Sequence, residues 1–157
     1  MSSVGSGAFA PDVFPVKYDP DRIGKDWVPV LKGLPLFEGM SARHLKRIPA
    51  RAKRFAAGET IVRAGDPGNA FYVILDGQVR VDPPARRSVV LTAGDYFGEM
   101  ALLDGAPRSA DIKAVGEVTV MVVARAAFTK LLRSEPQMSY ALLQTLAVRL
   151  RAAQDQF

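Results

Sequence analysis

Residues 94–110 read GDYFGEMALLDGAPRSA, a short stretch in which a helix-forming run lies between glycines. The run from Glu99 to Leu103 has good helical propensity, and Gly105 is placed to end it after about one turn. A short helix that opens directly after a glycine presents unpaired backbone N–H groups, and its dipole favours an anion. The stretch therefore predicts a place where a phosphate could be held.

The side chains of the same stretch extend this prediction. A guanidinium at Arg108 can donate to two phosphate oxygens at once, and the Ser109 hydroxyl adds a donor. Glu99 repels phosphate, but its oxygens can accept a hydrogen bond from a sugar hydroxyl. The alternative is an ion pair between Glu99 and Arg108 that only tethers a loop. If both side chains faced the interior without partners, their buried charges would destabilise the fold. We therefore expect a ligand to serve as their partner.

On both sides of this stretch, residues 52–123 consist of short runs rich in Val, Ile, Phe and Tyr that glycines separate. This rhythm is typical of a small antiparallel β-barrel. The predicted strands are 59–63, 70–75, 78–82, 88–92, 110–114 and 117–124. Asp76-Gly77 is a two-residue hairpin signal between the second and third of them.

Helices are predicted at both ends of the barrel. The first covers residues 26–34 and is short because of Pro29; the second covers 42–48, with Ser41 as its cap and Pro49 as its stop. After Arg125 the apolar period becomes helical, which predicts a short helix near 128–132 and a longer one from 138 to 154. Residues 1–30 are rich in Gly, Ser, Pro and Asp and are expected to be a partly irregular extension to a domain that covers 31–157.

Residues 97–110, FGEMALLDGAPRSA, resemble the phosphate-binding cassette of cyclic nucleotide-binding domains, and we call them the cassette. The glycine-punctuated stretches 57–59, 64–68, 71–77 and 93–95 also resemble that family, so the similarity runs from about residue 34 to residue 150. The resemblance implies a mainly β fold: an antiparallel jelly-roll barrel with N-terminal helices and C-terminal hinge and lid helices.

The resemblance also implies roles for single residues. Glu99 would hold the ribose 2′-hydroxyl and Arg108 the cyclic phosphate, assisted by Ser109. The rest of the implied ligand-binding set comprises Phe97, Gly98, Met100, Ala101, Ala110, Val81 and Leu91. Phe128 and Leu132 would form the hinge, and Ala153 and Gln154 the lid. A hydroxyl residue after the arginine occurs in binders of both nucleotides, so we expect cyclic AMP (cAMP) and keep cyclic GMP (cGMP) as the alternative.

Enzymatic function is not expected. The chain has no cysteine, which excludes a thiolate nucleophile and cysteine-ligated metals. A cupin-like metal site in a small barrel needs two or three histidines, and His44 is the only histidine. No nucleophile elbow or Walker loop is present either. The sequence thus predicts a sensor with no cofactor and no metal, and its competitor is a scaffold with the same fold and an empty pocket.

The sequence gives less information about location and output. It has no secretory leader and no apolar run of membrane-spanning length, so we expect a cytoplasmic protein. A DNA-reading helix-turn-helix domain has no room after the last helix, and the effector is therefore expected to be a separate protein. The stand-alone layout and the Arg- and Ala-rich composition suggest a bacterial member of the family.

Two further patterns have open interpretations. Leu142, Leu146 and Leu150 recur at four-residue spacing, which fits either a homodimer seam or docking on the barrel. The basic cluster, which we define as Arg43, Lys46, Arg47, Arg51, Lys53 and Arg54, contains no acidic residue. It would suit nucleic acid or an acidic protein face, but a solvated surface without a partner explains it as well.

Overall fold

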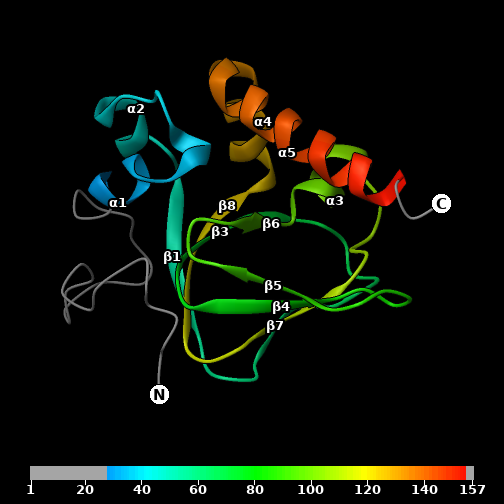
Figure 1. The fold of residues 1–157 in the computed structure, drawn as a ribbon. Helices are drawn as coiled ribbons and strands as arrows, with labels where there is room; N and C mark the ends of the chain where they lie inside the picture. The colour runs from blue at the N-terminus through cyan, green and yellow to red at the C-terminus, as the bar shows by residue number, and fades with distance from the viewer. Residues whose placement is uncertain (1–27, 155–157) are drawn as a thin grey trace.

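The computed structural model describes residues 28–154 (Figure 1). In chain order its elements are α1 (Val28–Lys32), the 3₁₀ helix η4 (Pro35–Phe37), α2 (Ala42–Lys46), β1 (Ala50–Phe55), β2 (Thr60–Val62), β3 (Ala70–Asp76), β4 (Gln78–Asp82), β5 (Val89–Thr92), β6 (Tyr96–Phe97), α3 (Glu99–Asp104), β7 (Asp111–Ala114), β8 (Val118–Ala124), α4 (Arg125–Ser134) and α5 (Pro136–Gln154). Most of the predicted extension, residues 1–27, lies outside the described residues.

The strands form two four-stranded sheets, ordered β1-β8-β3-β6 and β2-β7-β4-β5, and every strand pair is antiparallel. An inner core joins the two sheets, because its buried side chains come from strands of both; among them are Phe55, Ile74, Val79, Phe97 and Ile112. The mainly β antiparallel fold with flanking helices that the sequence predicts is therefore confirmed.

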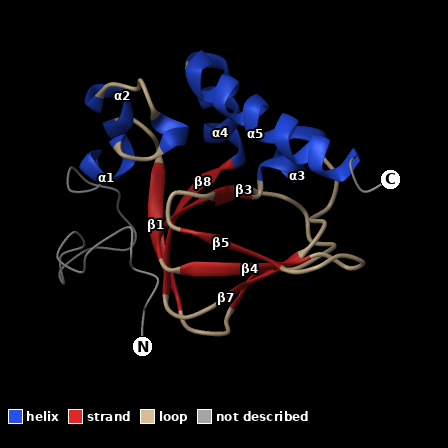
Figure 2. Ribbon diagram, viewed as in Figure 1, coloured by secondary structure: helices blue, strands red, loops and turns tan. Residues whose placement is uncertain are grey.

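A second core lies on the other face of the β1-β8-β3-β6 sheet, where the helices pack. Phe71, Val73 and Leu75 of β3 point into this outer core, whereas Ile74 of the same strand points into the inner one. A strand that is buried on both faces has an almost continuous apolar sequence, as β3 does. Figure 2 shows the helices gathered on one side of the strands, and this arrangement leaves the outer face of β5 exposed.

Each of the six predicted strands matches an observed strand to within one residue at either end, and the two-residue strand β6 was not among them. Strand β1 was not predicted either. Its sequence, ARAKRF, contains three cations, and only Ala52 and Phe55 are buried. These two residues belong to different cores, because Ala52 faces the helices and Phe55 faces the second sheet. β1 is an edge strand that pairs only with β8, so its other positions are free to be charged.

The helices agree with the sequence in their caps and stops. The Ser41 hydroxyl accepts a hydrogen bond from the His44 backbone N–H at 3.2 Å, and α2 ends before Pro49. Pro29 lies in the first turn of α1, where a missing N–H costs nothing. Helix α4, which contains the predicted hinge residues, is longer than expected, and α5 extends to Gln154. Within residues 28–154, no helix combines the length and the apolar character needed to cross a membrane.

Candidate functional site

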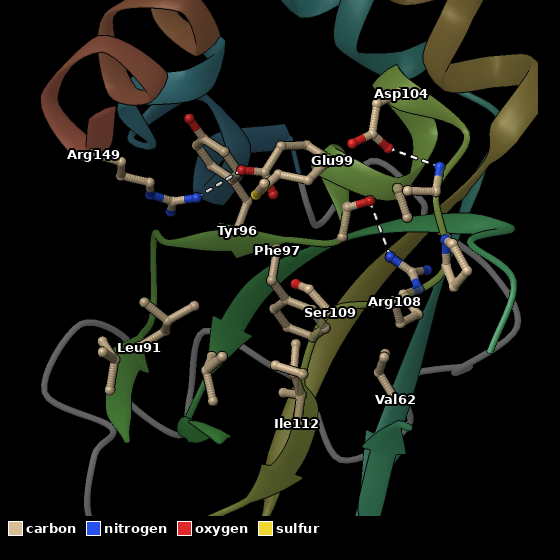
Figure 3. Close-up of a pocket in the computed structure, with 18 residues that line it drawn as sticks. Val62, Leu91, Tyr96, Phe97, Glu99, Asp104, Arg108, Ser109, Ile112 and Arg149 are labelled. Carbon is tan, nitrogen blue, oxygen red and sulfur yellow. Dashed lines mark hydrogen bonds and ion pairs between the residues drawn. The ribbon is translucent and has the colours of Figure 1, made fainter. Parts of the chain in front are cut away.

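A cavity of about 390 Å³ opens at the end of the barrel beneath α3 and α5 (Figure 3). All ten residues that the sequence assigned to ligand binding line it: Val81, Leu91, Phe97, Gly98, Glu99, Met100, Ala101, Arg108, Ser109 and Ala110. Eight of them belong to the cassette, and the other two come from β4 and β5. The cavity is thus closed on one side by the cassette and on the other by apolar strand residues.

Two glycines fix the backbone of the cassette. Gly98 precedes α3 with a φ of 93°, and Gly105 follows it with a φ of 73° while its N–H donates to the Ala101 carbonyl. Both values lie in the left-handed region that favours glycine. A Cβ at position 98 would lie 2.7 Å from Nη1 of Arg108 and 2.9 Å from the Ala70 carbonyl oxygen. Gly98 is therefore required for close approach as well as for its backbone angle.

Arg108 is anchored to the backbone of the barrel. The residue is only 8% exposed; its Nη1 donates to the Gly98 carbonyl at 3.0 Å and its Nη2 to the Ala70 carbonyl at 2.8 Å. Its guanidinium also lies 5.8 Å from the centre of the Tyr72 ring. Burial lowers the pKa of Arg108, but a guanidinium stays protonated at physiological pH. The cavity therefore contains a positive charge that is fixed in position.

Glu99 is held by a different part of the chain. It is 2% exposed, and its Oε2 accepts a hydrogen bond of 2.7 Å from Nη1 of Arg149 in α5, which the dashed line in Figure 3 marks. The sequence left open an ion pair between Glu99 and Arg108, and the structure shows none. Our expectation that these two charges lack partners without a ligand is also wrong, because each one has a partner within the chain.

Arg149 is one of eight cavity-lining residues that the sequence analysis did not assign to ligand binding. Besides its bond to Glu99, its guanidinium lies 5.9 Å from the centre of the Tyr96 ring, and both residues line the cavity. The Tyr96 hydroxyl is buried and makes no hydrogen bond of standard geometry among the described residues; burial raises the pKa of Tyr96, and the nearby Thr145 hydroxyl opposes this rise only in part. A helical arginine is common on exposed surfaces, so no local signal in the sequence distinguishes Arg149.

The predicted hinge and lid residues lie elsewhere than in the cavity. Phe128 is 1% exposed and stacks on Phe71, with 4.6 Å between ring centres, and Leu132 packs against the same outer core. Ala153 and Gln154, the predicted lid, do not line the cavity; α5 reaches it one turn earlier, at Arg149.

The leucines of α5 do not form one uniform stripe. Leu142 is buried in the outer core, Leu146 is half-buried and Leu150 is 60% exposed. Packing of α5 on the rest of the domain therefore explains why position 142 is apolar. It does not explain Leu150, which is exposed to solvent.

The single histidine lies outside the cavity. His44 in α2 has its Nδ1 3.4 Å from Oε2 of Glu135, at the junction of α4 and α5. Across residues 28–154, no group of three or more His, Asp or Glu side chains is placed to hold a metal ion.

Comparison with known proteins assigns the family. The model of the cyclic nucleotide-binding domain matches residues 52–135, which include the cassette, most of both sheets and α4. The chain therefore belongs to the cyclic nucleotide-binding domain family.

Three similar proteins illustrate the range of this family. A cyclic nucleotide-gated potassium channel of Mesorhizobium japonicum is 34% identical over 126 residues, which are 79% of this chain and 35% of the channel. The catabolite activator protein of Thermus thermophilus has a TM-score of 0.69 at 30% identity, covering 78% of this chain and 61% of that one. The second cAMP-binding domain of a protein kinase A regulatory subunit, bound to Sp-2Cl-cAMPS, has a TM-score of 0.70 at 26% identity, covering 83% of this chain and 90% of that one. This chain spans 20% to 35% of the length of the curated relatives that it matches.

Proposed function

We propose that this chain is a sensor that binds cAMP, with cGMP as the weaker ligand, in the cavity between the cassette and α5. One observation carries the proposal: a single cavity of nucleotide size collects a fixed cation, a buried carboxylate and an apolar wall. A cyclic nucleotide has one anionic phosphodiester, a ribose hydroxyl and a flat base, so each part of the ligand has a counterpart.

Arg108 is proposed to hold the phosphodiester. A guanidinium has five N–H groups, and the bonds to Gly98 and Ala70 occupy two of them. Three donors remain on a side chain that lines the cavity, which is enough for a bidentate contact with two phosphate oxygens. The two backbone bonds hold the guanidinium in place, so little side-chain entropy is lost when the ligand binds. Ser109, also on the cavity wall, would add a hydroxyl donor.

Glu99 is proposed to accept a hydrogen bond from the ribose. Its Oε2 is bound to Arg149, which leaves Oε1 as an acceptor for the 2′-hydroxyl. The base would then lie against the apolar wall that Val81, Leu91 and Met100 provide. In this arrangement one carboxylate joins the ligand to α5, because its two oxygens serve the two partners.

Output is proposed to pass through α5 to a separate effector protein in the cytoplasm. Ligand at Glu99 would stabilise the docked position of Arg149 and of the helix that carries it, and a partner would read that position. A ligand shifts such an equilibrium only by its difference in affinity for the two states. The relatives named as a gated channel and as kinase regulatory subunits support a regulatory role without catalysis.

The test is isothermal titration of the folded protein with cAMP, cGMP and the non-cyclic nucleotide 5′-AMP. We expect cAMP to bind most tightly and Arg108→Ala to weaken it by about 100-fold, the usual cost of removing a charged partner of a buried anion. Arg125→Ala is the matched control, because Arg125 also donates to a backbone carbonyl, that of Gly68, but does not line the cavity. No binding of any nucleotide by protein free of carried-over ligand would favour the scaffold interpretation.

A further inference from the structure

A second cavity, of about 350 Å³, lies between α2 and α4. It shares no residue with the nucleotide cavity, and its walls are His44, Arg47, Ile48, Pro49, Ala127, Lys130, Leu131, Ser134 and Glu135. The helix on one wall, α4, also carries the hinge residue Phe128. This cavity therefore adjoins the hinge and is separate from the proposed ligand site.

The floor of the second cavity is apolar and its rim is cationic. Ile48 and Leu131 are 5% and 8% exposed, and Pro49 and Ala127 complete the apolar lining. Arg47, the C-cap residue of α2, and the exposed Lys130 from α4 supply positive charge. An apolar floor within a charged rim is suited to one bulky apolar side chain with charged neighbours.

Positive charge extends well beyond this rim, through the basic cluster. Arg43 and Lys46 of α2 and the C-cap residue Arg47 are spaced so that they share a face of the helix end. The other three members of the cluster lie on the edge strand β1, and all six are exposed. The ion pairs found within residues 28–154 involve other cations. Within residues 28–154 none of these six cations forms a close ion pair, although the charge of Arg54 partly offsets the rise that burial causes in the pKa of Asp76.

One acidic residue lies in the cavity itself. Glu135 is 8% exposed, and its carboxylate is held by His44 at 3.4 Å and by Nε2 of Gln137 at 3.1 Å. A fixed carboxylate beside the floor disfavours a phosphate group there, but it can accept a hydrogen bond from a peptide N–H. The wall contains no Phe, Tyr or Trp on which a nucleobase could stack, and its one imidazole, His44, lies against the Glu135 carboxylate.

We propose that this cavity and the basic cluster form a docking surface for an acidic peptide segment of a partner protein. One bulky apolar residue of the peptide enters the cavity, and its Asp and Glu neighbours face Arg47, Lys130 and the basic cluster. Charge complementarity selects an acidic partner, and the apolar floor selects a peptide over a nucleic acid. A membrane surface fits less well, since lipid binding requires protruding apolar side chains and this floor is recessed.

Three labelled heptapeptides test the proposal by fluorescence polarisation on the full chain. Each has three acidic residues on either side of a central Leu, Phe or Ser. We expect the Leu and Phe peptides to bind about tenfold more tightly than the Ser peptide, because only they bury an apolar side chain. The double variant Arg47→Glu, Lys130→Glu should weaken all three, since it reverses the charge of the rim.

Two controls separate the cavity from general charge. Arg86→Glu, Arg87→Glu changes the net charge equally on the β4–β5 loop and should leave peptide binding unchanged. Ala127→Met partly fills the cavity and should abolish the preference for Leu over Ser while the affinity of the Ser peptide is retained. Equal affinity for the Leu and Ser peptides, or equal losses in the two double variants, would overturn the proposal. So would tighter binding of a thymidine oligonucleotide that is lost in Arg47→Glu, Lys130→Glu.

Discussion

The two buried charges of the nucleotide cavity are held by different parts of the molecule. Arg108 donates to the carbonyls of Gly98 and Ala70, both of which belong to the barrel and its cassette. Glu99 is bound by Arg149, a side chain 50 residues away on a helix that follows the barrel. Arg108 is thus held by the backbone of a strand and of the turn before α3. Glu99 is held by a long side chain that is half-exposed.

This difference suggests a division of labour. A cation fixed by two backbone bonds can bind an anion without rearranging, which favours affinity. A carboxylate shared between a ligand and a separate helix can make the position of that helix depend on the ligand, which favours signalling. Substitutions at Gly98 and Arg108 should change the half of the site held by the barrel, and substitutions at Arg149 the half held by α5.

Gly98→Ala should have the largest effect, and it acts on the half of the site in which the barrel backbone holds Arg108. It adds the strain of a positive φ and brings a Cβ against Arg108 and the Ala70 carbonyl. We expect the free energy of unfolding to fall by about 3 kcal/mol and nucleotide affinity to fall with it, because the guanidinium must move. Chemical denaturation and nucleotide titration of the same protein measure both effects.

Gly105→Ala is the control for this change. Gly105 also has a positive φ, 73°, but a Cβ there would meet nothing within 4 Å. The substitution should lower the free energy of unfolding by about 1 kcal/mol, which is the strain of the positive φ alone. Its nucleotide affinity should stay close to that of the unchanged protein. Equal losses in the two variants would show that backbone strain alone explains Gly98 and that its contact with Arg108 is unimportant.

Arg149→Ala should affect the other half of the site, in which α5 holds Glu99. Removing the guanidinium leaves Glu99 buried without its partner and takes a positive charge from a cavity proposed to bind an anion. We expect nucleotide affinity to fall by about tenfold and hydrogen exchange of the α5 amides to become insensitive to the nucleotide. Arg151→Ala, two residues further along the same exposed helix end, should change neither measurement. Tighter nucleotide binding by Arg149→Ala would instead make the pair with Glu99 an inhibitory contact.

The part of the site that the sequence predicted is the part built from neighbouring residues. The cassette is contiguous, and its glycines, its helical run and Arg108 lie within a few residues of one another, so local chemistry indicates the anion site. Its glycines are required by local geometry, as the positive φ values of Gly98 and Gly105 show. The roles in ligand binding came from the family resemblance and remain predictions.

The parts that could not be predicted depend on tertiary contacts. The pairing of β1 with β8 joins segments far apart in the sequence, and at an edge only Ala52 and Phe55 need to be apolar. The lid was predicted at Ala153 and Gln154, whereas Arg149 reaches the cavity, because the crossing of α5 over the barrel is set by packing of residues such as Leu142. The apolar periodicity of the sequence predicts the helix, but it does not predict which residues of the helix face the cavity.

Tyr96→Phe should give the smallest effect, at the boundary between the two halves. The Tyr96 hydroxyl is buried and makes no hydrogen bond of standard geometry, with the Thr145 hydroxyl as its nearest polar neighbour, so its removal should leave the free energy of unfolding unchanged at pH 7 or raise it by up to about 1 kcal/mol. Burial raises the pKa of Tyr96 in the folded state, so the unfolded chain ionises first. Ionisation then favours the unfolded chain, and the free energy of unfolding falls as the pH rises above about 10. The Phe variant should therefore gain stability over the unchanged protein above pH 10, as denaturation across pH 7 to 11 would show. A loss of nucleotide affinity without a change in stability would mean that the hydroxyl finds its partner in the ligand, which would place Tyr96 in the binding half.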